Sequence, residues 1–562
     1  MTAELTGTAA ADPARVRAAL SAALDGVFAL QRQDGSWQGT LPSSAVSTGS
    51  AVIALHTAGE SPDLVAAGTR WLRSAQEPDG GWADAPGGPS TLNATAIAVA
   101  ALRVVEGDRA DDAVARGLRR IDAMGGMDAV GDRERCTLKA VCQQYLAEAG
   151  LYPRERLGRM PYELLLAPAW LRNKLSFTVP GLAAWGVMQG RTREFGVLRR
   201  LVNRIAEPRA LAYLDDIRRY EGVSGGVEES PLMASIVAFG FHRAGLRPVP
   251  YLDYLRGTVR ADGSWPIDRD IEFSVSVYLV QALFDAGLAG DGRLRRIEPW
   301  IRAAQRSTAF APTGCPPGGW GWSMPSGWPD TDDTSGAVAS LAGLGAGRDD
   351  PALRRGVAWL LRMQNRDGSW GCFTRNARVS MDAPCAVMTA HALLALWRAG
   401  VGDGTSGPTA KAVRWFARAQ RGDGSFATPW FRDYTTGTAR VLEALSRLGL
   451  AGTPTGVRAR NWLLAHQHPD GGWGDGRGGA PTVEETAWAL IGLIGAGGAG
   501  DPATARGIDW LLRHQRDDGL WDPAMVGVYF LDLTYWCDHF ANAYALQALA
   551  RYASSLEEGD GG

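Results

Sequence analysis

The segment Gly318–Val338, GGWGWSMPSGWPDTDDTSGAV, gathers carboxyl groups that could act together as an acid. Asp330, Asp332 and Asp333 lie within four residues, directly after Pro329. Like charges resist ionising together, so the outer carboxylates are expected to raise the proton affinity of the middle one. The residues that follow predict a helix, whose N-terminal dipole stabilises an anion. The pattern predicts a general acid at a helix start, and the alternative is an acidic N-cap on a solvated turn.

The composition excludes several other functions. Lys and Arg number 58 against 60 Asp and Glu, which leaves a net charge of -2 and no electrostatic basis for binding nucleic acid. The 6 cysteines and 7 histidines show neither CxxC pairs nor metal-ligand spacing, so we expect no metal site and no disulfide scaffold. We find no apolar run long enough to span a membrane and no signal peptide at the N-terminus. We therefore expect a globular cytoplasmic protein.

A recurring phrase indicates which elements position the acids. Each copy has an apolar helical run, a glutamine, a short polar turn, a glycine and an aromatic residue. Such a repeat predicts one helix–turn–helix unit used many times, in which the glutamine amide bonds to the exposed backbone of the helix end. We expect the aromatic residue to be scaffold. The copies end at Trp37, Trp82, Trp370, Phe426, Trp473 and Trp521, with a weaker copy at Trp265.

The repeats predict an all-α fold of two α/α barrels. A Pro/Gly-rich stretch, AFAPTGCPPGGWGWSMPSGWPD, separates the N-terminal copies from the C-terminal ones and cannot be regular helix. We expect residues 1–22 and 300–562 to form the barrel that carries the acids, and residues 23–299 to form a second, inserted barrel. Ligand sites favour such junctions, so we expect the site where the barrels meet.

Together with the acid motif, these repeats resemble those of squalene–hopene and oxidosqualene cyclases, the class II terpene cyclases. The resemblance covers essentially the whole chain, and it includes MDAPCAVMTAHALLAL and the terminal VYFLDLTYWCDHFANAYALQALARY. It implies that Asp332 donates a proton to an alkene, that Asp330 and Asp333 tune it, and that His391 hydrogen-bonds to it. Such a reaction needs a strong acid that is shielded from water.

The resemblance also implies an aromatic pocket. A carbocation needs π faces, each worth about 2 kcal/mol, because bases along its path would quench it by deprotonation. No cofactor is expected for a hydrocarbon substrate, and Mg²⁺ is expected only if the substrate is a diphosphate. The pocket residues implied are Trp322, Phe373, Trp430, Tyr529, Phe530, Tyr535 and Trp536.

Several positions depart from the family pattern and predict a different cavity lining. We therefore expect a partially cyclised product to outweigh a pentacyclic one. Glutamates of the family are replaced by Thr48, Ser50 and Ile97, pocket tryptophans by Gly181 and Ser274, and a tyrosine by Thr436.

Three functions stay open at this point. The first is cyclisation of squalene or a related linear polyprene. The second is cyclisation of geranylgeranyl or farnesyl diphosphate with the diphosphate retained, held by inward-facing cations. The third is a non-catalytic or prenyltransferase-like α/α barrel, against which the DTDD motif argues. The cations considered for the diphosphate are Arg172, Lys174, Arg375 and Arg432.

The uncharged stretch Phe177–Gln189 has two readings, an interfacial membrane segment or a buried barrel helix. A substrate as apolar as squalene resides in the bilayer, which favours peripheral contact with the inner face of the cell membrane. We expect a monomer or a homodimer.

Overall fold

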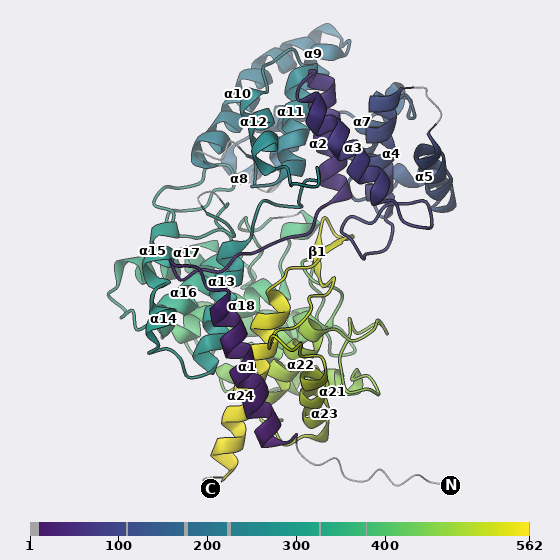
Figure 1. Cartoon of the computed structure of the whole chain (residues 1–562). Coiled ribbons are helices and arrows are strands. Elements are labelled where there is room, and N and C mark those ends of the chain that lie inside the picture. The colour runs from purple at the N-terminus through teal and green to yellow at the C-terminus, as the bar shows by residue number, and fades with distance from the viewer. Residues whose placement is uncertain are drawn as a thin grey trace.

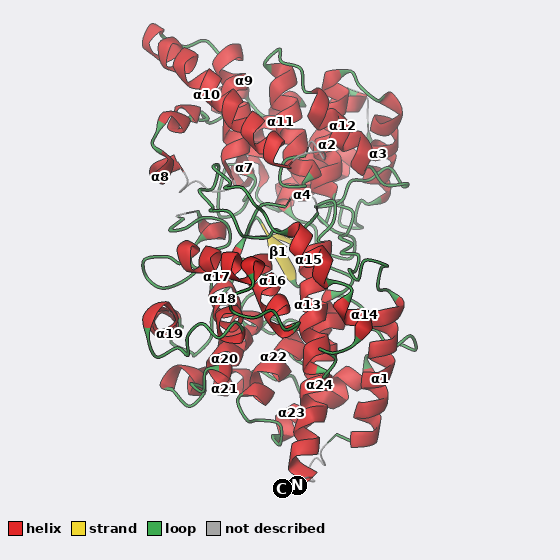
Figure 2. Ribbon diagram, turned by 90° about the vertical axis from the view of Figure 1, so that its left-hand side faces the viewer, coloured by secondary structure: helices red, strands yellow, loops and turns green. Residues whose placement is uncertain are grey.

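In the computed structural model the chain is almost entirely helical, with one short hairpin (Figure 1, Figure 2). The structure describes residues 11–107, 111–172, 178–221, 226–324, 327–377 and 379–560. Two helical bodies lie one above the other, joined by long loops, and both described chain ends lie on the lower body (Figure 1). The all-α prediction of two α/α barrels is confirmed.

The lower body is a closed double ring. Each inner helix contacts the next, and the last, α24, returns to the first, α13. Outer helices such as α17 are amphipathic and bury one face, whereas inner helices such as α22 are buried nearly all round. The inner ring consists of α13 (Glu272–Asp285), α16 (Thr331–Gly343), α18 (Ala386–Arg398), α20 (Thr435–Arg447), α22 (Val483–Gly495) and α24 (Phe540–Asp560). Around it lie α1 (Pro13–Ala29), α14 (Gly292–Arg295), α15 (Glu298–Ala304), α17 (Pro351–Met363), α19 (Gly407–Ala419), α21 (Pro454–Ala465) and α23 (Pro502–Arg513).

The upper body repeats this plan over fewer helices. Its inner helices contact one another in the order α7, α4, α2, α11, α9, and the rings of Tyr145 on α7 and Trp185 on α9 meet at 5.8 Å. The inner set is α7 (Lys139–Glu148), α4 (Leu92–Glu106), α2 (Ala45–Ala58), α11 (Pro231–Arg243) and α9 (Val179–Thr192). The outer set is α3 (Pro62–Ser74), α5 (Asp112–Ala123), α6 (Gly126–Val130), α8 (Ala169–Arg172), α10 (Val197–Glu221) and α12 (Val249–Thr258). Short 3₁₀ turns cover Arg154–Arg156, Tyr162–Leu166 and Ser380–Asp382.

The repeated turns fasten each helix pair to the next. In one copy, Gln364 donates from its amide to the carbonyl oxygens of Gly368 at 2.8 Å and Pro408 at 2.9 Å, the latter on the next outer helix. The Trp370 indole donates to the carbonyl of Leu360 at 2.7 Å, at the end of the preceding helix. The glutamines therefore satisfy helix-end carbonyls, as the sequence predicts.

The helix contacts shift the predicted domain boundaries. Helix α13 packs on α16 and α24, so the lower body begins near residue 272 and not near 300. The predicted boundary at residue 22 falls inside α1, which packs on α24 and α23. Gln515 of the last repeat donates to the carbonyl of Ala19 at 2.9 Å and so ties α1 to the lower ring.

A hairpin from the C-terminal region joins the two bodies. Strands β1 (Gly527–Tyr529) and β2 (Leu533–Tyr535) pair antiparallel and lie between the barrels (Figure 1). The Tyr529 hydroxyl donates to Asp84, and Asp532 accepts from Asn93 at 2.7 Å, so both contacts reach the upper body. The hairpin therefore forms part of the wall between the barrels.

Candidate active site

The predicted acids lie at the start of α16, as the sequence indicates. Asp330 is the N-cap residue, and its Oδ1 accepts a hydrogen bond from the backbone N–H of Asp333 at 2.8 Å. The backbone of Asp330 pairs with Trp320, whose own N–H donates to Thr334 at 3.0 Å. The tryptophan-rich loop thus fixes the first turn of the helix, and Asp332 projects from that turn.

Asp332 is held by groups from two neighbouring inner helices. The Tyr278 hydroxyl of α13 donates to its Oδ2 at 2.5 Å, and Nδ1 of His391 on α18 lies 2.5 Å from its Oδ1. Nε of Arg440 on α20 donates to His391 Nε2 at 2.8 Å. Because Nε2 accepts, the imidazole carries its proton on Nδ1 and donates it to Asp332. The predicted contact between His391 and the acid is thus present in the structure.

Arg440 belongs to a buried network of charges. Its Nη1 donates to Glu443 at 2.6 Å, and Glu443 also accepts from Arg551 at 2.5 Å. Arg551 in turn donates to Asp285 at 2.6 Å. Burial alone would raise the pKa of Glu443, but Arg551 and Arg440 outweigh it and lower that pKa to about 2. The network therefore holds Arg440 as a permanent cation behind His391.

The three aspartates differ in acidity, and not as the sequence predicts. Burial raises the pKa of Asp332, but His391, the Tyr278 hydroxyl and Arg440 together outweigh it, and the net pKa is lowered. Burial and the charge of Asp332 raise the pKa of Asp333 to about 7, and burial with Asp333 raises that of Asp330 well above its ordinary value. The expected rise for the middle carboxyl is wrong, because the sequence does not show its hydrogen-bond donors. The outer two carboxyls therefore bind protons more readily than ordinary carboxyls, while Asp332 has the most stable anion.

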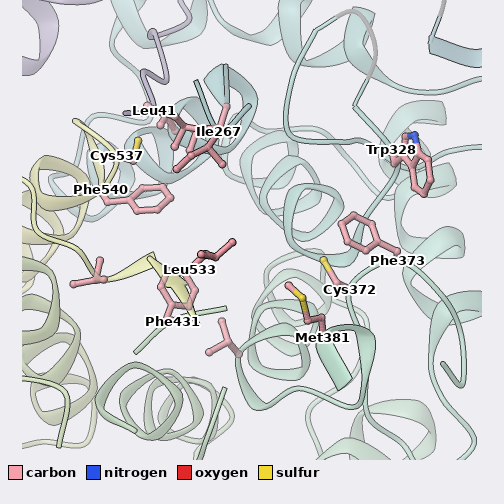
Figure 3. Packing of buried hydrophobic residues seen from close by; sticks show 14 of the residues in the cluster. Leu41, Ile267, Trp328, Cys372, Phe373, Met381, Phe431, Leu533, Cys537 and Phe540 are labelled. Atoms are coloured by element: carbon pink, nitrogen blue, oxygen red, sulfur yellow. The ribbon is translucent and has the colours of Figure 1, made fainter. Parts of the chain in front are cut away.

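The acids open into a cavity of about 170 Å³ between the barrels. Figure 3 shows part of its apolar wall, where Phe373, Cys372 and Met381 lie on one side and Leu41, Ile267 and Phe540 on another. Six of the predicted aromatic residues line it: Trp322, Phe373, Trp430, Tyr529, Phe530 and Tyr535. The Phe373 ring meets those of Trp322 and Trp430 at 5.9 Å each, so the wall is continuous.

Trp536 is not among the residues that line this cavity, which differs from the prediction. Strand β2 ends at Tyr535, so Trp536 lies in the link between the hairpin and α24.

Sequence reasoning missed several residues around the acid. Tyr278 contacts Asp332, and Arg440 contacts His391. Phe431 and Phe540 add two more aromatic rings to the cavity wall. The sequence contains one signal for Arg440, because Glu443 follows it by three residues, the spacing of an ion pair on one helix. That this pair is internal depends on the burial of α20, which only the structure shows.

The departures from the family pattern fall in three places. Ser274 lines the acid cavity and hydrogen-bonds to Asp333, so it is part of the acid cluster and not an empty space. Gly181 lines a second cavity, where a side chain would meet only Ile236, at 3.6 Å. Thr48, Ser50, Ile97 and Thr436 are buried and do not line the acid cavity.

The cations considered for a diphosphate do not line the acid cavity either. Arg432 donates to Glu485 at 2.6 Å, and Arg375 donates to the carbonyl of Gln364 at 2.7 Å. Arg172 lies 5.8 Å from the ring centre of Tyr213, and Lys174 lies outside the described residues. Of the described residues that line the acid cavity, none is Lys, Arg or His. Among the described residues no group of three or more His, Cys, Asp or Glu could hold a metal ion.

Two family comparisons together cover most of the chain. The squalene-hopene cyclase C-terminal domain matches residues 276–554, and the squalene-hopene cyclase N-terminal domain matches residues 20–185. Squalene–hopene cyclase of Alicyclobacillus acidocaldarius is 26% identical over 84% of this chain and 87% of its own length. Enfumafungin synthase of Hormonema carpetanum is 26% identical over 85% of this chain. The matched region covers 44% of the length of that longer protein.

A solved structure shares the fold. The ent-copalyl diphosphate synthase of Streptomyces platensis superposes with a TM-score of 0.59 at 22% identity, covering 96% of this chain and 99% of that one. The family matches and the fold place this chain among the class II terpene cyclases. Within that class it belongs to the squalene–hopene cyclase family.

Proposed function

We propose that this chain is a protonation-initiated cyclase that converts a neutral linear polyprene, squalene or a related isoprenoid, into a polycyclic terpene. The observation that carries the proposal is Asp332, which opens into an aromatic cavity and whose anion is stabilised by His391 and Tyr278. A lowered pKa means that protonated Asp332 is a strong acid, because its conjugate base is stabilised in advance.

In this mechanism the proton of Asp332 adds to the terminal double bond of the substrate. The carboxylate left behind accepts hydrogen bonds from Tyr278 and His391, and Arg440 keeps His391 oriented. Asp330 and Asp333 have raised pKa values, so they carry less negative charge beside the acid than ordinary carboxylates would. The aromatic wall of Trp322, Phe373 and Trp430 then faces the cation.

The lining of the acid cavity favours a hydrocarbon over a diphosphate as the group bound there. It contains carboxyls, aromatic rings and apolar side chains, and burying a diphosphate against carboxylates would be costly. The alternative substrate, a prenyl diphosphate with the diphosphate retained, would need its headgroup outside this cavity. An adjoining cavity shares Met233 and Phe530 with the first. Its lining includes Arg133, Lys139 and Arg159, which are the cations that could hold the diphosphate in the alternative function.

The test is incubation in D₂O with squalene, and separately with geranylgeranyl diphosphate, followed by mass spectrometry of the products. A cyclic product from squalene with one deuterium supports the proposal. We expect EDTA to leave this activity unchanged, because no step ionises a diphosphate. A labelled cyclic product from geranylgeranyl diphosphate alone, lost with EDTA and restored by Mg²⁺, would establish the alternative.

We also propose peripheral membrane contact, at a different surface from the predicted one. Of the stretch Phe177–Gln189, residue 177 lies outside the described residues and Val179–Gln189 forms a largely buried part of α9, so the buried-helix reading holds. Among the described residues no helix is long and apolar enough to cross a bilayer. The support is instead an exposed apolar group on α10, on α8 and on the 3₁₀ turn that α10 contacts: Leu164, Leu166, Leu171, Val197, Leu198, Leu201 and Ile205.

This apolar group adjoins the second cavity, because Leu164 belongs to both. An apolar substrate would thus have a path from a lipid surface toward the acid. Sedimentation with lipid vesicles tests the surface: Leu198→Glu with Leu201→Glu should weaken binding. Val457→Glu changes an exposed apolar residue on α21 of the lower barrel, 44% exposed against 77% for Leu198 and 53% for Leu201, and should not weaken binding. Equal binding by both variants would reject this surface.

A further inference from the structure

A second group of carboxyls lines the same cavity, and the mechanism above does not use it. Glu228 and Asp268 line the wall that the upper barrel contributes, together with Ser230 and Met233. Glu228 precedes α11, and Asp268 lies in the link between α12 and α13. Asp332 projects from the lower barrel, so the cavity has carboxyls on the walls given by both bodies.

Glu228 is buried without a partner for one of its oxygens. Glu228 is 9% exposed, and its Oε1 accepts no hydrogen bond within the described structure. Glu221 and Glu229 also have one unpartnered oxygen each, but neither residue lines the cavity. Glu229 accepts from Arg269 at 2.8 Å, and Glu221 accepts from Trp328 at 2.7 Å. A buried, unpaired oxygen on a cavity wall is costly and points to a role toward what the cavity binds.

The backbone holds this group in place at an energetic cost. Glu228 has φ 60° and Glu229 has φ 53°, both in the left-handed region that residues other than glycine rarely adopt. The N–H of Glu228 donates to Glu221 at 2.7 Å, which fixes the turn. Such strain persists only where the surrounding structure enforces it, and it often accompanies a functional group.

The electrostatics differ from those around Asp332. Burial, Glu221 and Asp268 raise the pKa of Glu228 well above its ordinary value, and no cation offsets them. Burial raises the pKa of Asp268 to about 7, only partly offset by a hydrogen bond from Ser230. Asp268 acts electrostatically on Glu228, so the two carboxyls do not ionise together, and burial makes the one that ionises a stronger base than an ordinary carboxylate.

We propose that Glu228 and Asp268 form the proton-accepting pair that ends the carbocation cascade. This inference rests on the proposed cyclase function. Each ring closure moves the positive charge along the chain, away from Asp332, and the pair is the anionic group that it meets on the upper wall. A C–H bond beside the cationic carbon breaks, its electron pair forms the new double bond, and the proton passes to a carboxylate oxygen of the pair.

The protons balance over the whole reaction. Asp332 gives one proton to the substrate and the pair removes one, so the product is an isomer of the substrate. The pair then releases its proton to solvent, and Asp332 regains one from solvent. No oxidant, reductant or metal takes part.

The test uses the double variant Glu228→Gln with Asp268→Asn, the two single variants, and Glu484→Gln as a matched control. Glu484 is a buried carboxyl with a raised pKa that does not line the cavity, and a glutamine there can still accept from the N–H of Ala524. Each protein is incubated in D₂O with the substrate that the wild type cyclises, and thermal melting checks the fold.

We expect the double variant to keep producing deuterium-labelled cyclic material, because Asp332 still initiates. The wild-type alkene should fall by at least about tenfold as a share of that material, with alcohols from capture by water or other alkene isomers in its place. Glu484→Gln should keep the wild-type product ratio.

An unchanged product ratio in the folded double variant would overturn the inference. So would loss of the deuterium label in a folded double variant, since the pair would then act in initiation. If wild-type activity depends on Mg²⁺ and the double variant loses Mg²⁺ binding, the carboxyls are ligands and not a base. Failure of the proposed function is separate, because the wild type itself would then give no labelled cyclic product.

Discussion

The two carboxyl groups of the cavity are alike in residue type and opposite in environment. Asp332 lies in the lower barrel, where His391, Tyr278 and Arg440 stabilise its anion and lower its pKa. Glu228 and Asp268 lie on the upper wall, where no cation contributes and burial raises both pKa values. The first group therefore gives up a proton readily, and the second group takes one.

This difference arises from how each barrel is built. The lower ring is closed, so α13, α18 and α20 all direct side chains toward the start of α16. The upper carboxyls come from loop segments, and the groups that act on them are one another, Glu221, Glu229 and Ser230, none of which is a cation. Neighbouring cations and hydrogen-bond donors, and not residue type, decide which carboxyl is the acid.

The largest effect should come from removing the acid proton. We expect Asp332→Asn to lose at least about 10³-fold in kcat while keeping its fold, because the amide has nearly the same shape. Product formation by mass spectrometry and thermal melting measure the two properties. Asp330→Asn is the matched control, since asparagine is also a good N-cap, and it should lose much less. Wild-type turnover in Asp332→Asn would show that Asp332 is not the acid that starts the reaction.

A smaller effect should follow from weakening the cation behind the acid. Arg440→Gln can still donate to His391 but carries no charge, so Asp332 becomes a weaker acid. We expect kcat to fall by about 10- to 100-fold, which equals one to two pKa units of acidity. Because the weaker acid keeps its proton longer, the alkaline fall in activity should move to higher pH.

The product ratio distinguishes this role from a general loss of structure. Arg440→Gln should leave the ratio of alkene products unchanged, because termination belongs to the upper pair. A changed product ratio with unchanged kcat would show that Arg440 acts on the cavity shape and not on the acid.

Tyr278→Phe should have a milder effect on the same group. The change removes one hydrogen bond to Asp332 at 2.5 Å and leaves the ring in its contacts with Phe540 and Tyr544. A hydrogen bond to a charged group is worth about 1.5–3 kcal/mol, so we expect roughly a tenfold or greater loss of kcat. Steady-state kinetics measure it, and a change confined to KM would contradict a role in acidity.

The smallest effect should appear in stability against pH. Asp333, Asp268 and Glu484 have folded pKa values raised to about 7, 7 and 8. The folded state binds more protons than the unfolded one between about pH 4 and 8, so the free energy of unfolding falls as pH rises through this window. We expect a lower Tm at pH 8 than at pH 5.5 by calorimetry.

Glu484→Gln gives the control for this pH effect. It removes one of the raised carboxyls, which is buried in α22 and accepts from the N–H of Ala524 at 2.9 Å. The difference in Tm between the two pH values should shrink in this variant. A Tm that rises from pH 5.5 to 8 would contradict the raised pKa values, because carboxyls with lowered pKa values are ionised in both states throughout this window.

Much of the scaffold could be predicted from the sequence, because its signals are local. The glutamine and tryptophan of each turn bond to backbone groups at the end of the preceding helix, so the repeat itself reports the helix pair. The DTDD motif likewise reports a helix start, since an aspartate N-cap accepts from the third residue after it. Such contacts span few residues and leave a pattern in the chain.

The sequence by itself determined the two barrels, the place of the acids at the start of a helix, and most of the aromatic wall. Only the tertiary structure decided which carboxyl has the stable anion, since Tyr278, His391 and Arg440 are far from Asp332 in the chain. It also decided that Glu228 faces the same cavity. Acidity depends on burial and on charges within a few ångströms, and ring closure, not sequence order, sets those distances.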